Sequence, residues 1–552
     1  MYNFKPVLVC KIGGKTETFR ETENANFTID IAADDAGIKC VIHPRRRIEL
    51  VSFTLEAERP LADGEVFFAN GFQSWSTTYE CGKDDKAGDI SPLAKVSAFT
   101  RRLAAMSGDY HFTECGRQGI VHSLTYTYFR KGGDIELFGS ATERTGYTIF
   151  ELNSVTGVFG IRKDVEGKTI DSDYELLDVK VFCGTYDNAF DAYFASLNLR
   201  KPGIEHLSGY TSWYNYFQKI DEKIILRDLD GLDGVKDSVS IFQIDDGYES
   251  YVGDWLDVDP VKFPGGMKMI ADRIHDKGYL AGIWIAPFSV QRVSKIAKEH
   301  PDWLIKDKNG KREWGCFAWG GAYTLDMYNP EVRKHIKHFF DVILNEWGYD
   351  MVKLDFLYSE ATEPRYNKTR GQIMCEAMDF LRECVGEEKL ILGCGVPLGP
   401  SFGVVDACRI SCDVDLVYSG KFYNKFNLNS ELPSAQNAIN NSIFRRHLNG
   451  RVFCNDPDVF FLRKDNLTFT DEQKELLATV NNMFGDVLFV SDNAGDYGEK
   501  EKEMVKKYFA PSKAKVISAE RKSKEVIEIR YTEDGEEKEL TFNLVKGEII
   551  RK

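Results

Sequence analysis

The sequence lacks the long apolar runs and the paired cysteines that would point to a membrane protein or a secreted one. It has no window of 18 uncharged apolar residues, and its first residues lack the basic and apolar stretches of a signal peptide. Its 12 cysteines are scattered without a CxxC pair, and several lie in apolar strand-like runs. These absences predict a cytoplasmic protein with reduced thiols.

Positive charge is also in short supply. Against 86 acidic residues there are 71 basic ones, which gives a net charge of −15. The resulting field repels phosphate backbones and anionic lipids, so we expect neither nucleic acid nor a membrane as a partner. Aromatic residues, in contrast, make up 13% of the chain. Most of them are expected in a large core, although such rings also pack against the faces of sugars.

The hydrophobic pattern changes twice along the 552 residues and predicts a multidomain α/β protein. Residues 1–203 read as short alternating segments separated by turns, which is typical of a β-sandwich. Residues 204–510 alternate apolar strands with amphipathic helices, which indicates a parallel α/β fold. Residues 511–552 return to period two around the turn Glu533–Gly535, and we expect a small antiparallel β-domain there.

The middle region contains enough alternating elements for a (β/α)8 TIM barrel. Helices are predicted between several of the strands, for example over Met267–Lys277 and Asp471–Phe484. The predicted strands are Gly209–Tyr214, Ser240–Asp245, Leu280–Pro287, Met351–Phe356, Leu390–Cys394, Ala407–Asp413, Arg451–Asp456 and Val487–Ser491.

Carboxylates predominate at the carboxyl ends of these strands, where barrel enzymes place their catalytic groups. Lys353 and Asp355 alternate with apolar residues, so both should line the barrel mouth. A lysine so close would keep the carboxylate ionised, which suits a nucleophile. A salt bridge that only satisfies two buried charges is an equally good interpretation of this strand alone.

The sixth strand gives the same pattern with Arg409, Ser411 and Asp413 predicted on one face. Two carboxylates at neighbouring strand ends are what retaining glycoside hydrolysis requires. An ionised Asp355 would raise the pKa of Asp413, so that Asp413 could hold the proton of a general acid.

Two adjacent aspartates, Asp245 and Asp246, follow the second strand. They cannot both face inward on a regular strand, so the strand must end there, and Gly247 allows the turn. A twin carboxylate at such a turn could accept hydrogen bonds from two hydroxyl groups. Helix capping or loop packing is the alternative.

Several strings in this region, taken in order and spacing, resemble the α-galactosidases of glycoside hydrolase family 36, in clan D. A further string, Asn70–Trp75, extends the resemblance into the first domain. The compact segment Ser411–Asp415 resembles the shorter subgroup of the family. The strings in the barrel are Trp213–Phe217, Gln243–Tyr248, Gly282–Phe288, Lys353–Phe356, Gly393–Gly395 and Arg409-x-x-x-Asp413.

The resemblance implies a retaining exo-α-galactosidase that acts on small oligosaccharides such as raffinose and melibiose, with no metal and no cofactor. It makes Asp355 the nucleophile and Asp413 the acid/base, and it assigns Asp245 and Asp246 to the galactose 4- and 6-hydroxyls. The other residues that it places around the sugar are Trp75, Trp213, Trp255, Lys353, Cys394 and Arg409.

Other functions stay open on the sequence. A metal-dependent barrel enzyme could use Asp246, Asp355 and Asp413 as ligands with Lys353 as base, and a non-catalytic sugar-binding protein would also use aromatic rings. Within the family, the alternatives are an α-N-acetylgalactosaminidase and a galactosyl transferase, which depend on the space for the C2 group near Cys394–Leu398 and on the acceptor subsite.

Asp415 is a rival for the acid role because it shares a predicted face with Asp413. We favour Asp413, which fits the Arg-x-x-x-Asp spacing. The oligomeric state is not predicted.

Overall fold

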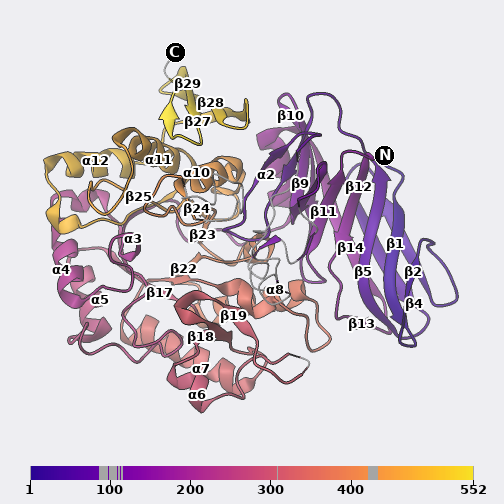
Figure 1. Cartoon of the computed structure of the whole chain (residues 1–552), viewed down its shortest axis with the longest axis horizontal. Coiled ribbons are helices and arrows are strands. Elements are labelled where there is room, and N and C mark those ends of the chain that lie inside the picture. The colour runs from indigo at the N-terminus through magenta and orange to yellow at the C-terminus, as the bar shows by residue number, and fades with distance from the viewer. Residues whose placement is uncertain are drawn as a thin grey trace. The chain divides into compact units, whose positions relative to one another are not determined.

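The computed structural model describes residues 2–85, 97, 108–109, 112–113, 116–307, 309–419 and 433–550 (Figure 1). The chain divides into two compact units. The sandwich unit comprises Met1–Leu199, Ala361–Asp379 and Pro397–Phe402. The barrel unit comprises Arg200–Glu360, Phe380–Val396 and Gly403–Lys552.

The sandwich unit is built from two antiparallel sheets, as the alternating segments predict. The first sheet runs in the order β2 (Lys15–Phe19), β1 (Lys5–Ile12), β5 (Ile48–Glu58), β12 (Val158–Lys163), β11 (Thr148–Asn153) and β8 (Ile120–Leu124), with β13 (Thr169–Ile170) also on β5. The second runs β3 (Phe27–Ala33), β4 (Gly37–Pro44), β14 (Tyr174–Thr185), β10 (Asp134–Ser140), β9 (Tyr126–Lys131), β6 (Val66–Ala69) and β7 (Tyr79–Cys81).

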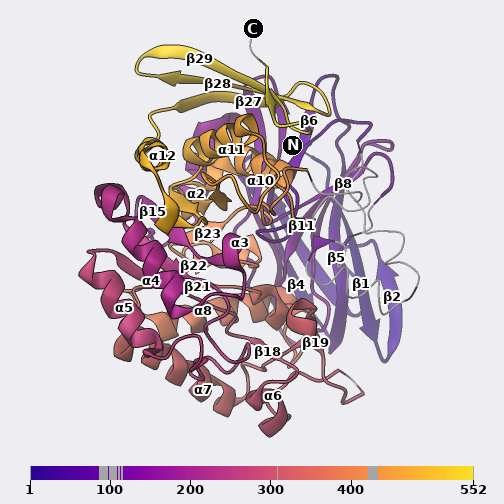
Figure 2. The same ribbon diagram turned by 60° about the vertical axis from the view of Figure 1, so that its left-hand side comes forward.

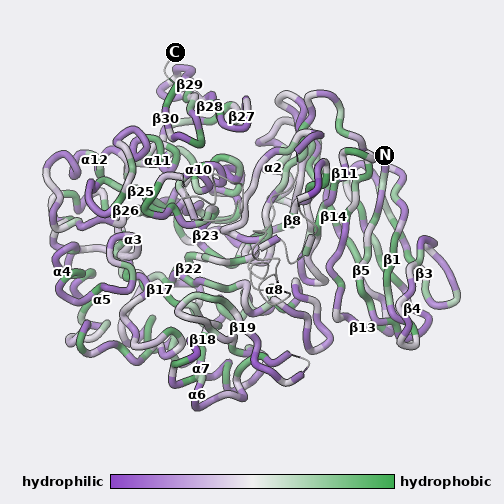
Figure 3. The backbone as a smooth tube through the Cα atoms, viewed as in Figure 1, coloured by the Kyte–Doolittle hydropathy of each residue, from purple (hydrophilic) through white to green (hydrophobic). Residues whose placement is uncertain are grey.

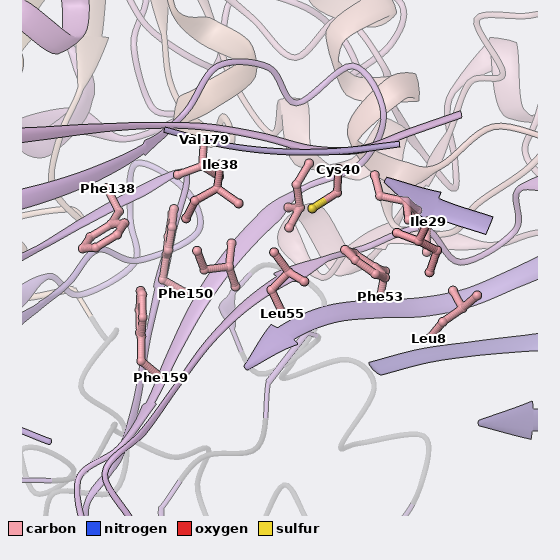
Figure 4. Packing of buried hydrophobic residues seen from close by; sticks show 14 of the residues in the cluster. Leu8, Ile29, Ile38, Cys40, Phe53, Leu55, Phe138, Phe150, Phe159 and Val179 are labelled. Carbon is pink, nitrogen blue, oxygen red and sulfur yellow. The ribbon is translucent and has the colours of Figure 1, made fainter. Parts of the chain in front are cut away.

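Alternation along these strands creates the core of the sandwich. Hydrophobic and hydrophilic residues alternate along strands such as β5 (Figure 3). The inward side chains of both sheets meet in one cluster that includes Phe53, Phe138 and Phe159, all almost fully buried (Figure 4). Helix α2 (Tyr186–Ser196) packs on β10 and β14.

The barrel unit contains the parallel strands that the sequence predicts, each within a few residues of its expected place. Among the described residues these are β15 (Leu207–Thr211), β16 (Ile241–Ile244), β17 (Leu280–Ile285), β21 (Met351–Leu354), β22 (Leu390–Gly393), β23 (Ala407–Arg409), β24 (Cys454–Asp456) and β26 (Val487–Val490). The same sheet also contains β25 (Val459–Phe460), which the sequence did not predict.

The ring closes at its seventh strand, which is split in two. β24 pairs with β23 on one side, and β25 pairs with β26 on the other. Pro457 and Asp458 lie between the two pieces, and Asp458 has a left-handed φ of 79°. β24 and β25 therefore act together as one strand of an eight-stranded barrel, which confirms the predicted fold.

Helices follow the strands where the periodicity predicts them, and both ribbon views show α4 and α5 outside the strands (Figures 1 and 2). Local signals fix several starts: Asp221 caps α4, Asn329 and Pro330 begin α7, and Thr470 forms a capping box on α11. The longer helices are α4 (Glu222–Gly231), α5 (Gly266–Asp276), α7 (Pro330–Asp341), α8 (Arg370–Val385), α10 (Ala435–Phe444), α11 (Asp471–Phe484) and α12 (Glu499–Phe509).

Two smaller sheets belong to the barrel unit. An insertion after β17 forms β18 (Ser289–Gln291), β19 (Trp314–Cys316) and β20 (Ala322–Thr324). The antiparallel sheet at the end of the chain contains β27 (Lys515–Arg521), β28 (Val526–Glu533), β29 (Glu536–Asn543) and β30 (Glu548–Ile549), with the predicted turn at Asp534 and Gly535. The domain boundaries at 203 and 510 stay predictions.

One expectation about the sixth strand is wrong. β23 ends at Arg409, so Ser411 and Asp413 lie beyond the strand and cannot share a face with Arg409 by strand alternation. The turn brings Asp413 back to Arg409 instead. None of the described helices is long and apolar enough to cross a membrane.

Candidate active site

Asp355, the predicted nucleophile, lies directly after β21 and is held at both carboxylate oxygens. The indole Nε1 of Trp284 donates to Oδ2 at 3.1 Å, and the amide of Phe356 donates to Oδ1 at 2.8 Å. Phe356 has a left-handed φ of 55°, a conformation that a bulky residue adopts only where its surroundings enforce it. The carboxylate is therefore fixed in one orientation.

The pKa of Asp355 lies above the ordinary value for an aspartate. Burial raises it, the positive charge of Lys353 and the two hydrogen bonds lower it, and the charge of Asp413 raises it. The expected effect of the lysine is thus present, but burial outweighs it.

Lys353 forms its ion pair with Asp245 rather than with Asp355. Its Nζ lies 2.8 Å from Asp245 Oδ2, and both side chains are buried. Gln243 Nε2 donates to the same oxygen at 2.9 Å. Burial lowers the pKa of Lys353, but the surrounding anions, Asp245 first, more than reverse this effect. Lys353 therefore stays charged and connects the second strand to the fourth.

Asp246 is held by neutral donors. Trp319 Nε1 donates to its Oδ2 at 2.8 Å, and Gln218 Nε2 donates to the same oxygen at 2.9 Å. Burial raises the pKa of Asp246, and it raises that of the neighbouring Glu249 much further, with help from the charge of Asp246. Burial thus favours the neutral form of Glu249 beside Asp246.

The turn after the two aspartates depends on Gly247. Its φ is 123°, and a Cβ there would lie 2.8 Å from the backbone of Gln218. The close approach is what brings Gln218 to Asp246, and β16 ends at Ile244 as the adjacent aspartates predict.

Arg409 and Asp413 form the second carboxylate site. Arg409 ends β23 and is almost completely buried, and its Nη2 donates to Asp413 Oδ1 at 2.8 Å. The side chain of Asp413 is 41% exposed. Asp415, the rival for the acid role, accepts a hydrogen bond at its Oδ1 from the amide of Leu416 at 2.6 Å.

Cys394 follows β22 and lies within electrostatic reach of both carboxylates. Burial raises the pKa of its thiol well above the ordinary value, and the charges of Asp355 and Asp413 raise it further, while Arg409 and Lys353 lower it. The structure therefore brings together five predicted site residues at the ends of the adjacent strands β21, β22 and β23. They are Lys353, Asp355, Cys394, Arg409 and Asp413.

The three tryptophans that the resemblance places around the sugar lie in three different parts of the chain. Trp213 begins α3 (Trp213–Tyr216), with its ring centroid 5.1 Å from that of Phe217. Trp255 is 1% exposed and packs edge-on against Trp284, at 5.7 Å between centroids. Trp75 lies in the loop between β6 and β7 of the sandwich unit. A sugar contact by any of the three stays a prediction.

Sequence reasoning missed Trp284, Trp319, Gln218 and Glu249. Trp284 had a signal, because it lies in the quoted string Gly282–Phe288 and pairs in register with Lys353 on β21. No sequence signal pointed to Trp319, because it reaches Asp246 from the insertion after β17 with a left-handed φ of 57°. Over the described part of the chain, no three histidine, cysteine or acidic side chains converge as a group that could hold a metal ion.

Comparison with known proteins agrees with this geometry. Residues 215–379 match the Melibiase family model. Alpha-galactosidase 1 of Pediococcus pentosaceus is 30% identical over 139 residues, which is 23% of this chain and 18% of that protein. The A type blood alpha-D-galactosamine galactosaminidase of Flavonifractor plautii is 28% identical over 155 residues, which is 26% of this chain and 14% of that protein. The chain thus matches less than a fifth of either curated relative.

The solved structure of TtGalA, an α-galactosidase from Thermus thermophilus in complex with p-nitrophenyl α-D-galactopyranoside, matches over a much greater length. It is 25% identical, with a TM-score of 0.72, and the match covers 92% of this chain and 98% of that one. The family model, these relatives and this solved structure all agree with the resemblance to the α-galactosidases of glycoside hydrolase family 36.

Proposed function

We propose that this protein is a retaining exo-α-galactosidase that removes terminal α-linked galactose from small oligosaccharides such as raffinose and melibiose. The observation that carries the proposal is the contrast between Asp355 and Asp413. Asp355 is buried and held at both oxygens, and Asp413 is partly exposed and rests on a guanidinium. A nucleophile needs a fixed carboxylate, and an acid/base must exchange its proton with water.

In the proposed mechanism Asp355 attacks the anomeric carbon while the bond to the leaving oxygen breaks. Asp413 gives its proton to that oxygen, so the first product leaves neutral. Asp413 then takes a proton from water as the water oxygen attacks the glycosyl–Asp355 ester, and the Asp355 carboxylate is released. Two inversions at the anomeric carbon give a product of retained configuration.

Recognition of galactose is assigned to Asp245 and Asp246. Both carboxylates are buried and are already oriented by Lys353, Gln243, Trp319 and Gln218. Anchored acceptors of this kind discriminate between hydroxyl epimers, because the wrong sugar leaves a buried charge without its partner. Trp213, Trp255, Cys394 and Arg409 complete the proposed sugar site of the barrel unit.

The first test compares the hydrolysis of p-nitrophenyl α-galactoside and α-glucoside by the whole chain, with and without EDTA. We expect hydrolysis of the galactoside alone and no effect of the chelator. Loss of activity in EDTA would favour the metal-dependent alternative, and binding of galactose without turnover would favour a sugar-binding protein.

The group at C2 of the sugar is the second question, because one matched relative is a galactosaminidase from F. plautii. Parallel assays on nitrophenyl α-galactoside and α-N-acetylgalactosaminide answer it. We expect kcat/KM to favour the galactoside, and the opposite preference would make the protein an α-N-acetylgalactosaminidase. An excess of galactosyl transfer to added sucrose over hydrolysis would favour the transferase.

A cytoplasmic location is part of the proposal. The cysteines among the described residues are free thiols, and most of them are buried. Buried thiols in this number suit a reducing compartment. Fractionation of the producing cells tests this, with recovery in the secreted fraction as the contrary result.

A further inference from the structure

The break in the seventh barrel strand places a buried carboxylate beneath Asp413. Asp458 lies between β24 and β25, is 3% exposed and has a φ of 79°. Left-handed backbone is uncommon for residues other than glycine, although aspartate adopts it more readily than most. The contacts of the Asp458 side chain show what this conformation achieves.

One oxygen of Asp458 gathers three donors from different parts of the barrel. The hydroxyl of Tyr214, which follows β15, donates to Oδ2. The amide of Val414 donates to the same oxygen at 2.9 Å, and Arg409 Nη2 lies 3.0 Å from it. The carboxylate is thus held in place, and it holds its neighbours in turn.

Two of these three contacts lead directly to Asp413. The Arg409 nitrogen that meets Asp458 is also the donor to Asp413 Oδ1, at 2.8 Å. Val414 is the residue after Asp413, so its amide fixes the backbone on which the carboxylate stands. Asp413 lies beyond the end of β23, where the sheet no longer sets its position.

We infer that Asp458 is a positioning residue for proton transfer by Asp413, acting through the Arg409 guanidinium and the Val414 amide. This inference rests on the proposed function. Asp458 itself is buried below the partly exposed Asp413 and is not proposed to touch the substrate.

The charges around Asp458 agree with this role. The pKa of Asp458 is raised to about 7, because burial and the charges of Asp413 and Asp456 raise it by more than Arg409 and the Tyr214 hydrogen bond lower it. Three carboxylates therefore compete for one guanidinium. An amide at position 458 would keep the size of the side chain and leave Arg409 to the other two.

The experiment measures kcat/KM of purified full-length Asp458→Asn on aryl α-galactosides whose leaving groups range from activated to poor. Only a poor leaving group needs the proton of Asp413. We expect a fall of at least about 30-fold for the poorest leaving group and less than about 3-fold for the most activated one, within the range of general acid catalysis.

The matched control is Asp486→Asn. Asp486 is a partly buried aspartate that precedes β26 at the opposite end of the barrel and accepts a hydrogen bond from Asn449 at 2.6 Å. We expect this variant to change all substrates equally. If Asp458→Asn does not fold, Tyr214→Phe removes one donor from Asp458 and should give the same selectivity in weaker form.

An equal loss of kcat/KM across all leaving groups in both Asp458→Asn and Tyr214→Phe would overturn the inference, because that result indicates a general structural role. Wild-type protein that cleaves none of the aryl α-galactosides would overturn the proposed function, and the inference with it. The two failures are therefore distinguishable.

Discussion

The two catalytic carboxylates proposed for this barrel lie at nearby strand ends but in opposite surroundings. Asp355 is 8% exposed and receives two neutral donors, Trp284 and the Phe356 amide. The side chain of Asp413 is 41% exposed and receives a guanidinium. The difference shows how one barrel can give two aspartates separate roles: burial and fixed donors immobilise one, and access to water lets the other exchange protons.

The largest effect on activity is expected from replacing the buried carboxylate of Asp355. Asp355→Asn removes the nucleophile with little change in size, and kcat/KM should fall by at least about 10⁴-fold for every substrate, including activated ones. Steady-state assays on aryl α-galactosides measure this, and unchanged melting shows that the fold is intact. Residual activity above a tenth of wild type would contradict the assignment.

Replacement of the exposed partner should have a more selective effect. Asp413→Asn should lower kcat/KM by about 10²- to 10⁴-fold for poor leaving groups and much less for activated ones. Azide should restore turnover of activated substrates, because a small anion attacks the glycosyl ester without a base. The same measurements on Asp415→Asn provide the control, and a selective loss there instead would make Asp415 the acid.

Lys353 allows a test of the electrostatics on the buried side. The nucleophile must be ionised, so activity falls as the pH drops through the pKa of Asp355, which burial already raises. Lys353 lowers that pKa, and Lys353→Met should therefore move the acidic limb of the kcat/KM profile to higher pH. Lys389→Met, a lysine paired with Asp350 before β21, is the control. An unmoved limb in Lys353→Met would mean that Lys353 does not tune Asp355.

The smallest effect is expected at Asp246. Trp319→Phe removes one of its two neutral donors while Gln218 remains. A hydrogen bond to a charged group contributes about 1.5–3 kcal/mol, and the remaining donor should limit the increase in KM to about tenfold. The value of kcat should change little. The control is Trp303→Phe, because Trp303 stacks on His300 outside the site. A larger fall in kcat than rise in KM for Trp319→Phe would argue against a binding role.

Much of the fold could be predicted from the sequence because its signals are local. Apolar runs that alternate with amphipathic helices identified the eight barrel strands, and the period of Asp471–Phe484 gave the bounds of α11. The contacts within the site are not local. Lys353 and Asp245 are separated by 108 residues, so strand four alone could not reveal that Lys353 pairs with Asp245.

Backbone turns account for the remaining differences. Strand alternation predicted Asp413 on the face of Arg409, whereas a turn after β23 brings the two together. Asp458 and Trp319 are themselves in left-handed conformations, with φ values of 79° and 57°. Neither side chain signals such a turn in the sequence in the way that glycine does.

The most direct test of the central claim is covalent trapping of the nucleophile. A mechanism-based fluorinated α-galactosyl fluoride should inactivate the full-length protein and form a stable ester, which peptide mass spectrometry locates. We predict one galactosyl group on the peptide that contains Asp355, with none in Asp355→Asn. A label on Asp413, or activity that survives stoichiometric labelling, would contradict the account.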